Sequence, residues 1–319
     1  MPLGEFDIIA RYFSRSSRRS DVLLGVGDDA ALLTPAPGQV LVAATDTLVE
    51  GRHFLPGAPA DAIGHQALAV NLSDLAAMGA EPAWALLSLS MPRSDERWLA
   101  GFADGLFALA ERHGVALVGG DTVSGPLVVT VEVLGFVPPA VVLRRSGARA
   151  GDLIIVSGAP GVAAAGLEEL QSGRATFESK DARVRRFLRA EPRLALGRAL
   201  RGFATAAMDV SDGLLGDLGK LARSSGVGAC IELERLPLAP ELAAYPLAEQ
   251  ERLVLHGGDD YELLFTLPAD HFGHIAQLAE AGGCRLRCLG SMVQGEGVEC
   301  RRDGARVSVA GKGYDHFAS

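Results

Sequence analysis

Aspartates follow apolar, strand-like runs at five places along this chain. The runs are VLLGVGDD (22–29), LVAATD (41–46), VALVGGD (115–121), AAMDVSD (206–212) and LVLHGGDD (253–260). Because folds place their functional groups at strand ends, carboxylates delivered there repeatedly indicate a site rather than a means of solubility. If several of them converge, their repulsion raises their pKa values and destabilises the fold unless cations lie among them.

The donor atoms in these segments are hard oxygens, with little nitrogen or sulfur chemistry beside them. Such ligands favour Mg²⁺ or Ca²⁺ over zinc. A site with several Mg²⁺ ions usually serves a nucleoside triphosphate, so the aspartates predict a protein that uses one.

Other acids have a structural explanation as well as a possible role as metal ligands. Asp74 lies in a predicted apolar helix, where a carboxylate is costly unless it is paired, metal-bound or turned to solvent. Asp28 and Asp29 are adjacent and point in different directions along an extended chain, so only one need reach a metal. Asp209 and Asp212 precede a predicted helix, whose N-cap could be Ser211 or Asp212. A capped helix N-terminus also favours phosphate, so the two interpretations are compatible.

The common nucleotide-binding loops do not explain this pattern. The P-loop motif GxxxxGK[ST] occurs nowhere in the sequence. GVGDDA (25–30) matches GxGxxA only superficially, because it would place two carboxylates against a pyrophosphate. SGAPGVAAAG (157–166) lies between a predicted strand and a predicted helix. It is either a tight structural turn or a loop whose N–H groups approach a phosphate.

Composition limits the partners. The chain has 319 residues, is 48% hydrophobic and has a mean hydropathy of +0.21, which suits two folded domains. A net charge of −9 and a pI near 5.3 argue against nucleic acid and anionic membranes as partners.

The cysteines and the N-terminus predict a cytoplasmic location. The four cysteines lack the spacing of a zinc site, and we expect them to be reduced thiols: Cys230, Cys284, Cys288 and Cys300. The N-terminus lacks the apolar core of a signal peptide. The most apolar long stretch, 126–143, contains Glu132 and two prolines, so we expect no membrane span.

Strand and helix patterns alternate through both halves of the chain. Helices are predicted over 5–13, 61–79, 95–113, 181–189, 192–202, 213–225 and 270–281, and strands near 22–26, 40–45, 84–91, 115–119, 127–136, 229–233 and 262–267, with others leading into Asp209 and Asp259. The segment 138–152 mixes prolines, arginines and glycines and is the predicted boundary. We expect an α/β (α+β) fold in two domains, with the site at their interface.

A series of motifs spans essentially the whole chain. In order they are GEFDIIARYF, GVGDDAALL, ATDTLVEGRHF, ALAVNLSDLAAMGAEPAW, LVGGDT, RSGARAGD, DVSDGL, GGDDYEL and KGYDHF. This set resembles the thiamine-monophosphate kinase family, within a superfamily of ATP-using enzymes that lack a P-loop. The family often carries Ser before its Thr-Asp pair, where this chain has Ala44, so only the backbone carbonyl could bind metal there.

The resemblance implies an N-terminal α/β domain (1–140) whose strands pair across a homodimer, and a C-terminal α/β domain (141–319). ATP and several Mg²⁺ ions would occupy the cleft between these domains. The residues at the family's Mg²⁺ positions are Asp29, Thr45, Asp46, Asp74, Asp121, Asp209 and Asp212. Those at its ATP positions are Gly120, Asp121, Arg145 and Ser211, of which Asp121 and Arg145 would act electrostatically in catalysis. Those at its thiamine monophosphate positions are His53, Asp259 and Tyr314.

The resulting prediction is phosphoryl transfer from ATP to thiamine monophosphate, giving thiamine diphosphate. The absence of cysteine before Cys230 disfavours a selenophosphate synthetase, and GGDDYEL with KGYDHF disfavours an aminoimidazole ribonucleotide synthetase. A non-catalytic protein that binds divalent cations is the alternative from another class. ATP turnover that depends on thiamine monophosphate would separate it from a kinase.

Overall fold

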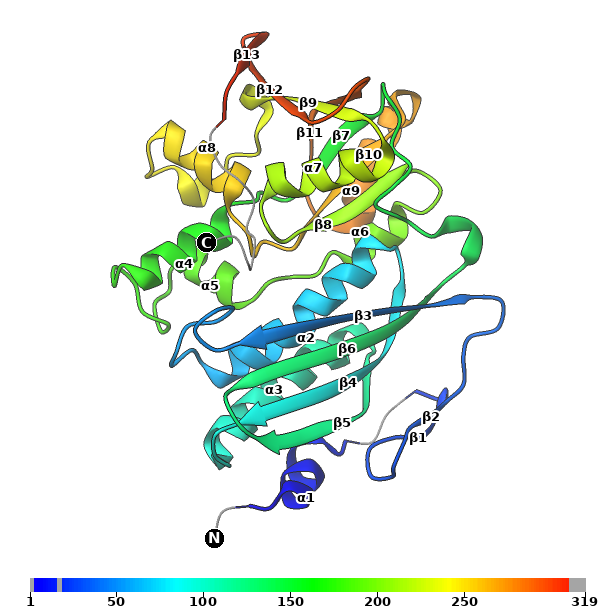
Figure 1. Cartoon of the computed structure of the whole chain (residues 1–319), viewed down its shortest axis with the longest axis vertical. Helices are drawn as coiled ribbons and strands as arrows, with labels where there is room; N and C mark the ends of the chain where they lie inside the picture. Colours follow the sequence, from blue (N-terminus) through cyan, green and yellow to red (C-terminus); the bar gives the residue numbers. More distant parts are fainter. Residues whose placement is uncertain (1–2, 16–18, 310–319) are drawn as a thin grey trace. The chain divides into compact units, whose positions relative to one another are not determined.

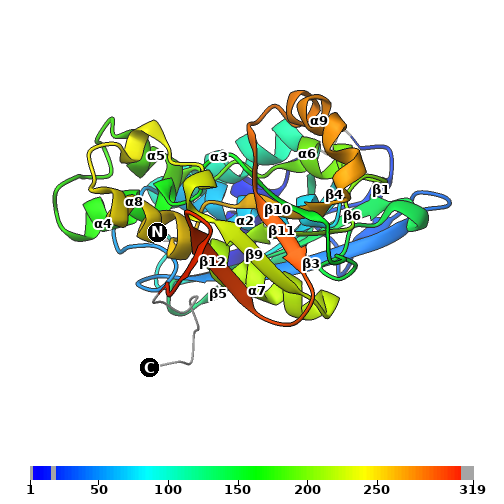
Figure 2. The same cartoon turned by 90° about the horizontal axis from the view of Figure 1, so that it is seen from above.

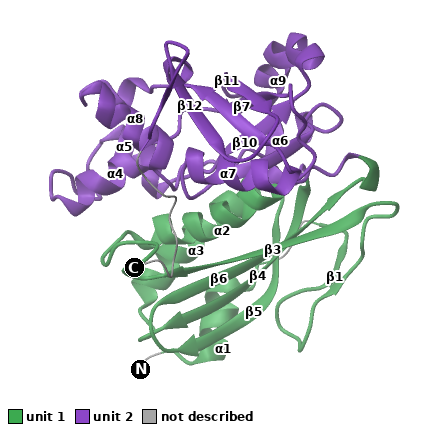
Figure 3. Cartoon of the chain, turned by 45° about the horizontal axis from the view of Figure 1, so that its top comes forward, with its two compact units in different colours: residues 1–75, 80–140 green, residues 76–79, 141–319 purple. Residues whose placement is uncertain are grey.

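The computed structural model divides into two units, shown in different colours in Figure 3, and describes residues 3–15 and 19–309. Unit 1 comprises residues 1–75 and 80–140, and unit 2 comprises residues 76–79 and 141–319.

Unit 1 is built on a four-stranded sheet. Its strands are β3 (Val40–Val49), β4 (Glu81–Met91), β5 (Ala116–Ser124) and β6 (Val128–Val137), in the order β3-β6-β4-β5. The pairings are antiparallel except for the parallel pair β4–β5. Helices α2 (Ala60–Ala77) and α3 (Glu96–His113) lie together behind this sheet in Figure 1 and confirm the helices predicted at 61–79 and 95–113. A short hairpin pairs β1 (Val22–Leu24) with β2 (Leu32–Leu33).

Local signals in the sequence set the ends of α3. The carboxylate of Asp95 accepts the N–H groups of Arg97 and Trp98, which otherwise lack a partner in the first turn. Gly114 ends the helix in the left-handed conformation, with φ of 66°. The N-terminal segment is less regular than predicted, because α1 (Glu5–Ile8) continues as a π-helical turn at Ile9–Phe13.

Unit 2 is a mixed α/β unit around a seven-stranded sheet. The sheet order is β13-β12-β9-β11-β7-β10-β8, and the pairings are antiparallel except for β9–β12. The strands are β7 (Leu153–Ser157), β8 (Ala206–Val210), β9 (Gly228–Glu232), β10 (Glu262–Leu267), β11 (Leu286–Val293), β12 (Val298–Arg302) and β13 (Ala305–Val307).

Helices cover both faces of this second sheet. They are α4 (Val162–Gln171), α5 (Ala182–Leu188), α6 (Leu194–Ala199), α7 (Leu214–Ser225), α8 (Leu247–His256) and α9 (Ile275–Gly282). Figures 1 and 2 show α7 on one side of the sheet and α6 with α9 on the other. A hydrophobic core of the unit joins α4, α7 and α8 to the sheet through buried aliphatic side chains such as Val162, Leu218 and Leu253.

The structure corrects two predictions about where the aspartates lie. The run 253–256, predicted as a strand, forms the last turn of α8, which begins after Pro246. Its three consecutive apolar residues, 253–255, are buried on the helix, and such a short run cannot be told from a strand by periodicity alone. Asp46, Asp121 and Asp209 lie within strands and not beyond their ends, because the sheet pairings continue past them.

The cysteines are unpaired, as predicted, and Cys230 and Cys300 are buried. Among the residues that the structure describes, no helix is long and apolar enough to cross a membrane.

Candidate functional site

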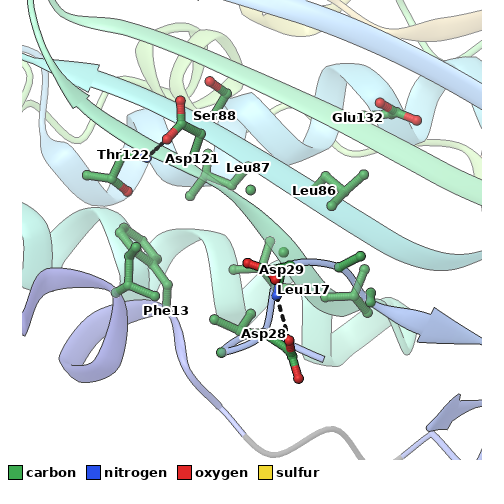
Figure 4. A pocket seen from close by; sticks show the side chains of 18 of the residues that line it. Phe13, Asp28, Asp29, Leu86, Leu87, Ser88, Leu117, Asp121, Thr122 and Glu132 are labelled. Atoms are coloured by element: carbon green, nitrogen blue, oxygen red, sulfur yellow. Dashed lines mark hydrogen bonds between the residues drawn. The ribbon is translucent and has the colours of Figure 1, made fainter. Parts of the chain in front are cut away.

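One pocket in unit 1 collects several of the predicted site residues. It has a volume of about 880 Å³, and Asp29, Thr45, Gly120 and Asp121 line it. Asp28 and Glu132 add two further carboxylates, as Figure 4 shows. Within the described part of the chain, no lysine, arginine or histidine lines this pocket. The carboxylates of this pocket are therefore not neutralised by any basic side chain among its described lining residues.

The register of the sheet places these side chains on one face. Thr45 of β3 is the cross-strand partner of Glu132 on β6. Ser88 of β4 is the cross-strand partner of Asp121 on β5, and this second pair lies two residue positions further along the sheet. Because side chains on a strand alternate between faces, positions two apart on one strand share a face. The carboxylates of Asp121 and Glu132 are thereby delivered from β5 and β6 to the same surface.

Gly120 is the position at which β5 needs glycine. Its φ is +147°, and a Cβ there would lie 1.8 Å from the carbonyl oxygen of Leu87. The neighbouring strands also change register near this point, between Ala85 and Leu86. Gly120 therefore lets β5 come close to β4 just before Asp121.

An apolar wall completes the pocket. Phe6, Ile9 and Phe13 come from the N-terminal helical segment, and Leu117 comes from β5. The pocket could therefore hold a ligand that has a flat apolar group next to a polyanion with bound cations.

Three other predicted residues of unit 1 do not line this pocket. Asp46 follows Thr45 on β3 and so points to the opposite face. Asp74 is partly exposed on α2, while residues 71–73 and 75–77 are buried. His53 lies after β3, where its Nδ1 accepts the N–H of Val49 at 3.0 Å. The structure thus groups only part of the predicted set.

In unit 2, the turn between β8 and α7 carries Asp209, Ser211 and Asp212. Asp209 is buried near the end of β8. The carboxylate of Asp217, itself fully buried on α7, accepts the N–H groups of Ser211 and Asp212 at 3.0 Å each. Lys220 bridges the two acids, with its Nζ 2.5 Å from Asp212 and 2.8 Å from Asp217. Burial raises the pKa of Asp217 despite that cation.

Asp259 lies close to this turn. Its N–H donates to the carbonyl oxygen of Ser211 at 3.1 Å. Burial, with a smaller contribution from the charge of Asp212, raises the pKa of Asp259 to about 6. Two carboxylates thus lie near one another with Lys220 beside one of them, an arrangement that a further cation would stabilise.

Arg145 belongs to the exposed loop that runs beside β8. The carbonyl oxygen of Arg144 accepts the N–H of Ala207 at 2.8 Å, and Ser225 Oγ accepts the N–H groups of Gly147 and Ala148. The guanidinium is exposed, so it is available to an anionic ligand. Tyr314 lies outside the described residues.

Three residues of these sites are not among those that the sequence predicts: Glu132, Asp217 and Lys220. Asp217 carries a signal that could have revealed it, because it lies on the same helical face as Leu214, Leu218 and Leu221, which are all buried. Glu132 offers no such signal in the sequence, since an acid in an alternating strand usually faces water.

Among the described residues, no three acidic, histidine or cysteine side chains are close enough together to hold a metal ion. Each unit nevertheless presents carboxylate and hydroxyl oxygens that could act as donors. This chemistry suits a hard divalent cation bound together with a ligand that completes its coordination, such as a polyphosphate.

Protein-family models and curated relatives match this chain over most of its length. Residues 27–137 match the model for "AIR synthase related protein, N-terminal domain", and residues 149–303 match the model for the corresponding C-terminal domain. The thiamine-monophosphate kinase of Escherichia coli K12 is 49% identical over 325 aligned residues that cover 100% of both chains, and that of Bacillus subtilis is 36% identical over 99% of this chain and 100% of its own.

Solved structures are also similar to this chain over most of its length. The crystal structure of thiamine-monophosphate kinase from Stenotrophomonas maltophilia K279a has a TM-score of 0.88 and 45% identity, covering 96% of this chain and 99% of that one. A structure of AaThiL complexed with AMPPCP and TMP has a TM-score of 0.77 and 34% identity, covering 89% of each chain.

Proposed function

The chain belongs to the thiamine-monophosphate kinase family and is an ATP-dependent kinase of thiamine monophosphate, and we propose that it transfers the phosphoryl group directly with the help of Mg²⁺. The observation that carries this mechanism is the pocket of unit 1, which has four carboxylates and, among its described lining residues, no basic side chain. Such a surface would repel ATP unless divalent cations accompanied the nucleotide.

The oxygen donors present suit Mg²⁺. We infer that Asp29, Thr45 and Asp121 bind Mg²⁺ in the pocket of unit 1. We infer that the remaining Mg²⁺ ligands come from residues that do not line this pocket, Asp46 and Asp74 of unit 1 and Asp209 and Asp212 of unit 2. Bound Mg²⁺ would neutralise the phosphates and favour in-line geometry. Asp29 remains preferred over Asp28, since the carboxylate of Asp28 already accepts the N–H of Asp29 at 2.8 Å.

The protein's own residues bind and orient the reactants. The acceptor is a phosphate oxygen that is already anionic, so the reaction needs no dedicated base. Arg145 offers a planar fork of donors to a phosphate, and Gly120 and Ser211 complete the ATP contacts. His53, Asp259 and Tyr314 bind thiamine monophosphate. Asp259 would face the cationic thiazolium as an ionised carboxylate, which cation binding promotes by lowering its pKa.

An assay of ADP release tests the reaction. We expect release to require both Mg²⁺ and thiamine monophosphate, and to be absent with unphosphorylated thiamine, which lacks the acceptor oxygen. ADP release at the same rate without any acceptor would contradict the proposal, and a protein that binds Mg²⁺ without turnover would be the non-catalytic alternative.

We also infer a homodimer in which strands of unit 1 pair with those of a second subunit. The edge strands of the sheet in unit 1 are β3 and β5, so each has one side without a partner strand within this sheet. An edge of this kind favours pairing with a strand of another chain. Light scattering should give twice the chain mass of 33.3 kDa, and a monomer at micromolar concentration would contradict the inference.

Tyr314 provides a test of the thiamine pocket. Thiamine carries a permanently positive thiazolium, and a cation stacked on an aromatic ring is stabilised by roughly 0.5–2 kcal/mol. We therefore expect Tyr314→Ala to raise the KM for thiamine monophosphate severalfold to about thirtyfold, with little change for ATP. Tyr314→Phe keeps the ring and should retain a nearly normal KM. Equal losses for both substrates would indicate a folding defect, and no loss would remove Tyr314 from the pocket.

A further inference from the structure

The turn at residues 257–262 has an unusual backbone. Asp259 and Tyr261 have positive φ values of 66° and 52°, a conformation shared among the described non-glycine residues only by Asp303. Residues with side chains adopt this conformation at a cost, so the surrounding structure must hold them there.

The turn that precedes α7 helps to keep these two residues in this conformation. Tyr261 donates its N–H to the carbonyl oxygen of Val210 at 3.1 Å, next to the bond from Asp259 to Ser211. A Cβ on Gly258 would lie 2.3 Å from the carbonyl oxygen of Ser211. The two turns are therefore in backbone contact.

Asp260 anchors the other side of the turn. Its side chain is fully buried, and its two oxygens accept the N–H groups of Gly161 and Ala163 at 2.5 and 3.1 Å. These groups belong to the first turn of α4, where the helix favours negative charge. The glycine-rich turn at 157–161 thus binds a carboxylate of the protein itself, which supports the structural interpretation of that motif over phosphate binding.

Charged side chains reinforce this anchor. Arg186 donates to the carbonyl oxygen of Asp260 at 3.0 Å and also to the carboxylate of Glu262. Glu262 further accepts Arg193 Nε at 2.7 Å and Ser157 Oγ at 2.5 Å. Two buried carboxyl groups and two guanidinium groups therefore flank the turn, and burial raises the pKa of Asp260 to about 7.

We propose that Asp260 is a positioning residue, which fixes the 257–262 turn to α4 and so holds Asp259 where thiamine monophosphate binds. Asp260 itself has no exposed surface and acts through Asp259. The role of Asp259 as a substrate contact rests on the proposed function, whereas the attachment of the turn to α4 does not.

The test compares Asp260→Asn with a matched control, Glu169→Gln. Asparagine keeps the size of Asp260 but cannot offer two acceptor oxygens to Gly161 and Ala163. Glu169 lies near the other end of α4, is also buried, and binds Arg174 at 2.9 Å and Tyr245 at 2.5 Å. Each variant replaces one buried carboxyl group by an amide, and only Asp260→Asn touches the turn.

Amide hydrogen exchange without ligands reports on the attachment itself. We expect exchange of residues 257–263 to become at least about tenfold faster in Asp260→Asn and to stay unchanged in Glu169→Gln. In turnover assays, Asp260→Asn should raise the KM for thiamine monophosphate and lower kcat roughly 10- to 100-fold, because small displacements of a binding group are costly. The KM for ATP should change less than about twofold.

Similar exchange and kinetics in the two variants would overturn the proposal and leave Asp260 with a stabilising role alone. If Asp260→Asn does not fold, Arg186→Met removes the donor to the carbonyl of Asp260 while keeping both carboxylates, and it should show the same pattern more weakly. A normal KM in folded Arg186→Met would then contradict the proposal. Wild-type protein that fails to turn over thiamine monophosphate would refute the proposed function, while the exchange result would still decide whether Asp260 holds the turn.

Discussion

Replacing Asp121 with asparagine should lower turnover by about 10²-fold or more while the free energy of unfolding hardly changes. The expected loss is large because the amide keeps the size of the side chain but not the charge that would hold Mg²⁺ at the phosphates. The fold should survive because Asp121 is exposed. The carboxylate of Asp121 accepts the N–H of Thr122 at 2.9 Å, and an asparagine oxygen can also accept this N–H.

Asp104→Asn is a suitable control for that variant. Asp104 is an exposed aspartate of α3 that does not line the pocket, and its pairing with Arg15 at 3.5 Å is a surface contact. We expect normal turnover in the control. Titration of Mg²⁺ should show a higher requirement in Asp121→Asn, and near-normal turnover at ordinary Mg²⁺ would remove Asp121 from the metal site.

The sequence predicts the two long helices of unit 1, α2 and α3, because signals for helices of this length are local. The helix after Asp95 has a capping carboxylate, an apolar stripe and a closing glycine, and all three are visible in the residues alone. The run 253–256 had no such local signal. These residues pack in the core of unit 2 as the last turn of a helix, whereas the sequence predicts a strand.

The candidate site likewise contains residues that local motifs predict and residues that only long-range contacts bring there. Short motifs identified Thr45, Gly120 and Asp121, and the structure places all three at one pocket, while their roles stay predictions. The location of Glu132 in that pocket depends on the register between β3 and β6, which is a long-range property. The bond from Asp260 to α4 joins residues about a hundred positions apart, so no local pattern could reveal it.

The adjacent pair Asp259 and Asp260 illustrates why local chemistry is insufficient. Both are aspartates in the same motif, yet one is partly exposed and the other has no exposed surface. Their backbone positions differ in which neighbours they meet, Ser211 for Asp259 and the first turn of α4 for Asp260. Tertiary contacts therefore decide which aspartate can touch a substrate.

The largest effect on stability is expected for Glu262→Gln. Glu262 is 1% exposed and is the shared partner of Arg186 and Arg193, so its loss leaves two partly buried guanidinium groups without their common carboxylate. Breaking a buried ion pair by removing one partner typically costs about 3–5 kcal/mol. Denaturant unfolding near neutral pH should show a loss of this size, whereas Glu249→Gln, which breaks a surface pair with Arg252, should cost less than about 1 kcal/mol.

The difference between wild type and Glu262→Gln should also depend on pH. Burial disfavours the ionised form of Glu262, but hydrogen bonds and charge from Arg193, with the charge of Arg186, outweigh it and hold its pKa below the usual value of 4.5. A carboxyl with a lowered pKa in the folded state stabilises the protein above its unfolded-state pKa, and this contribution is lost as pH falls through the folded-state pKa. The two proteins should therefore differ most above pH 4.5 and converge in acid. A difference that stays constant down to strongly acidic pH would show that the shape of the side chain, and not its charge, stabilises this part of unit 2.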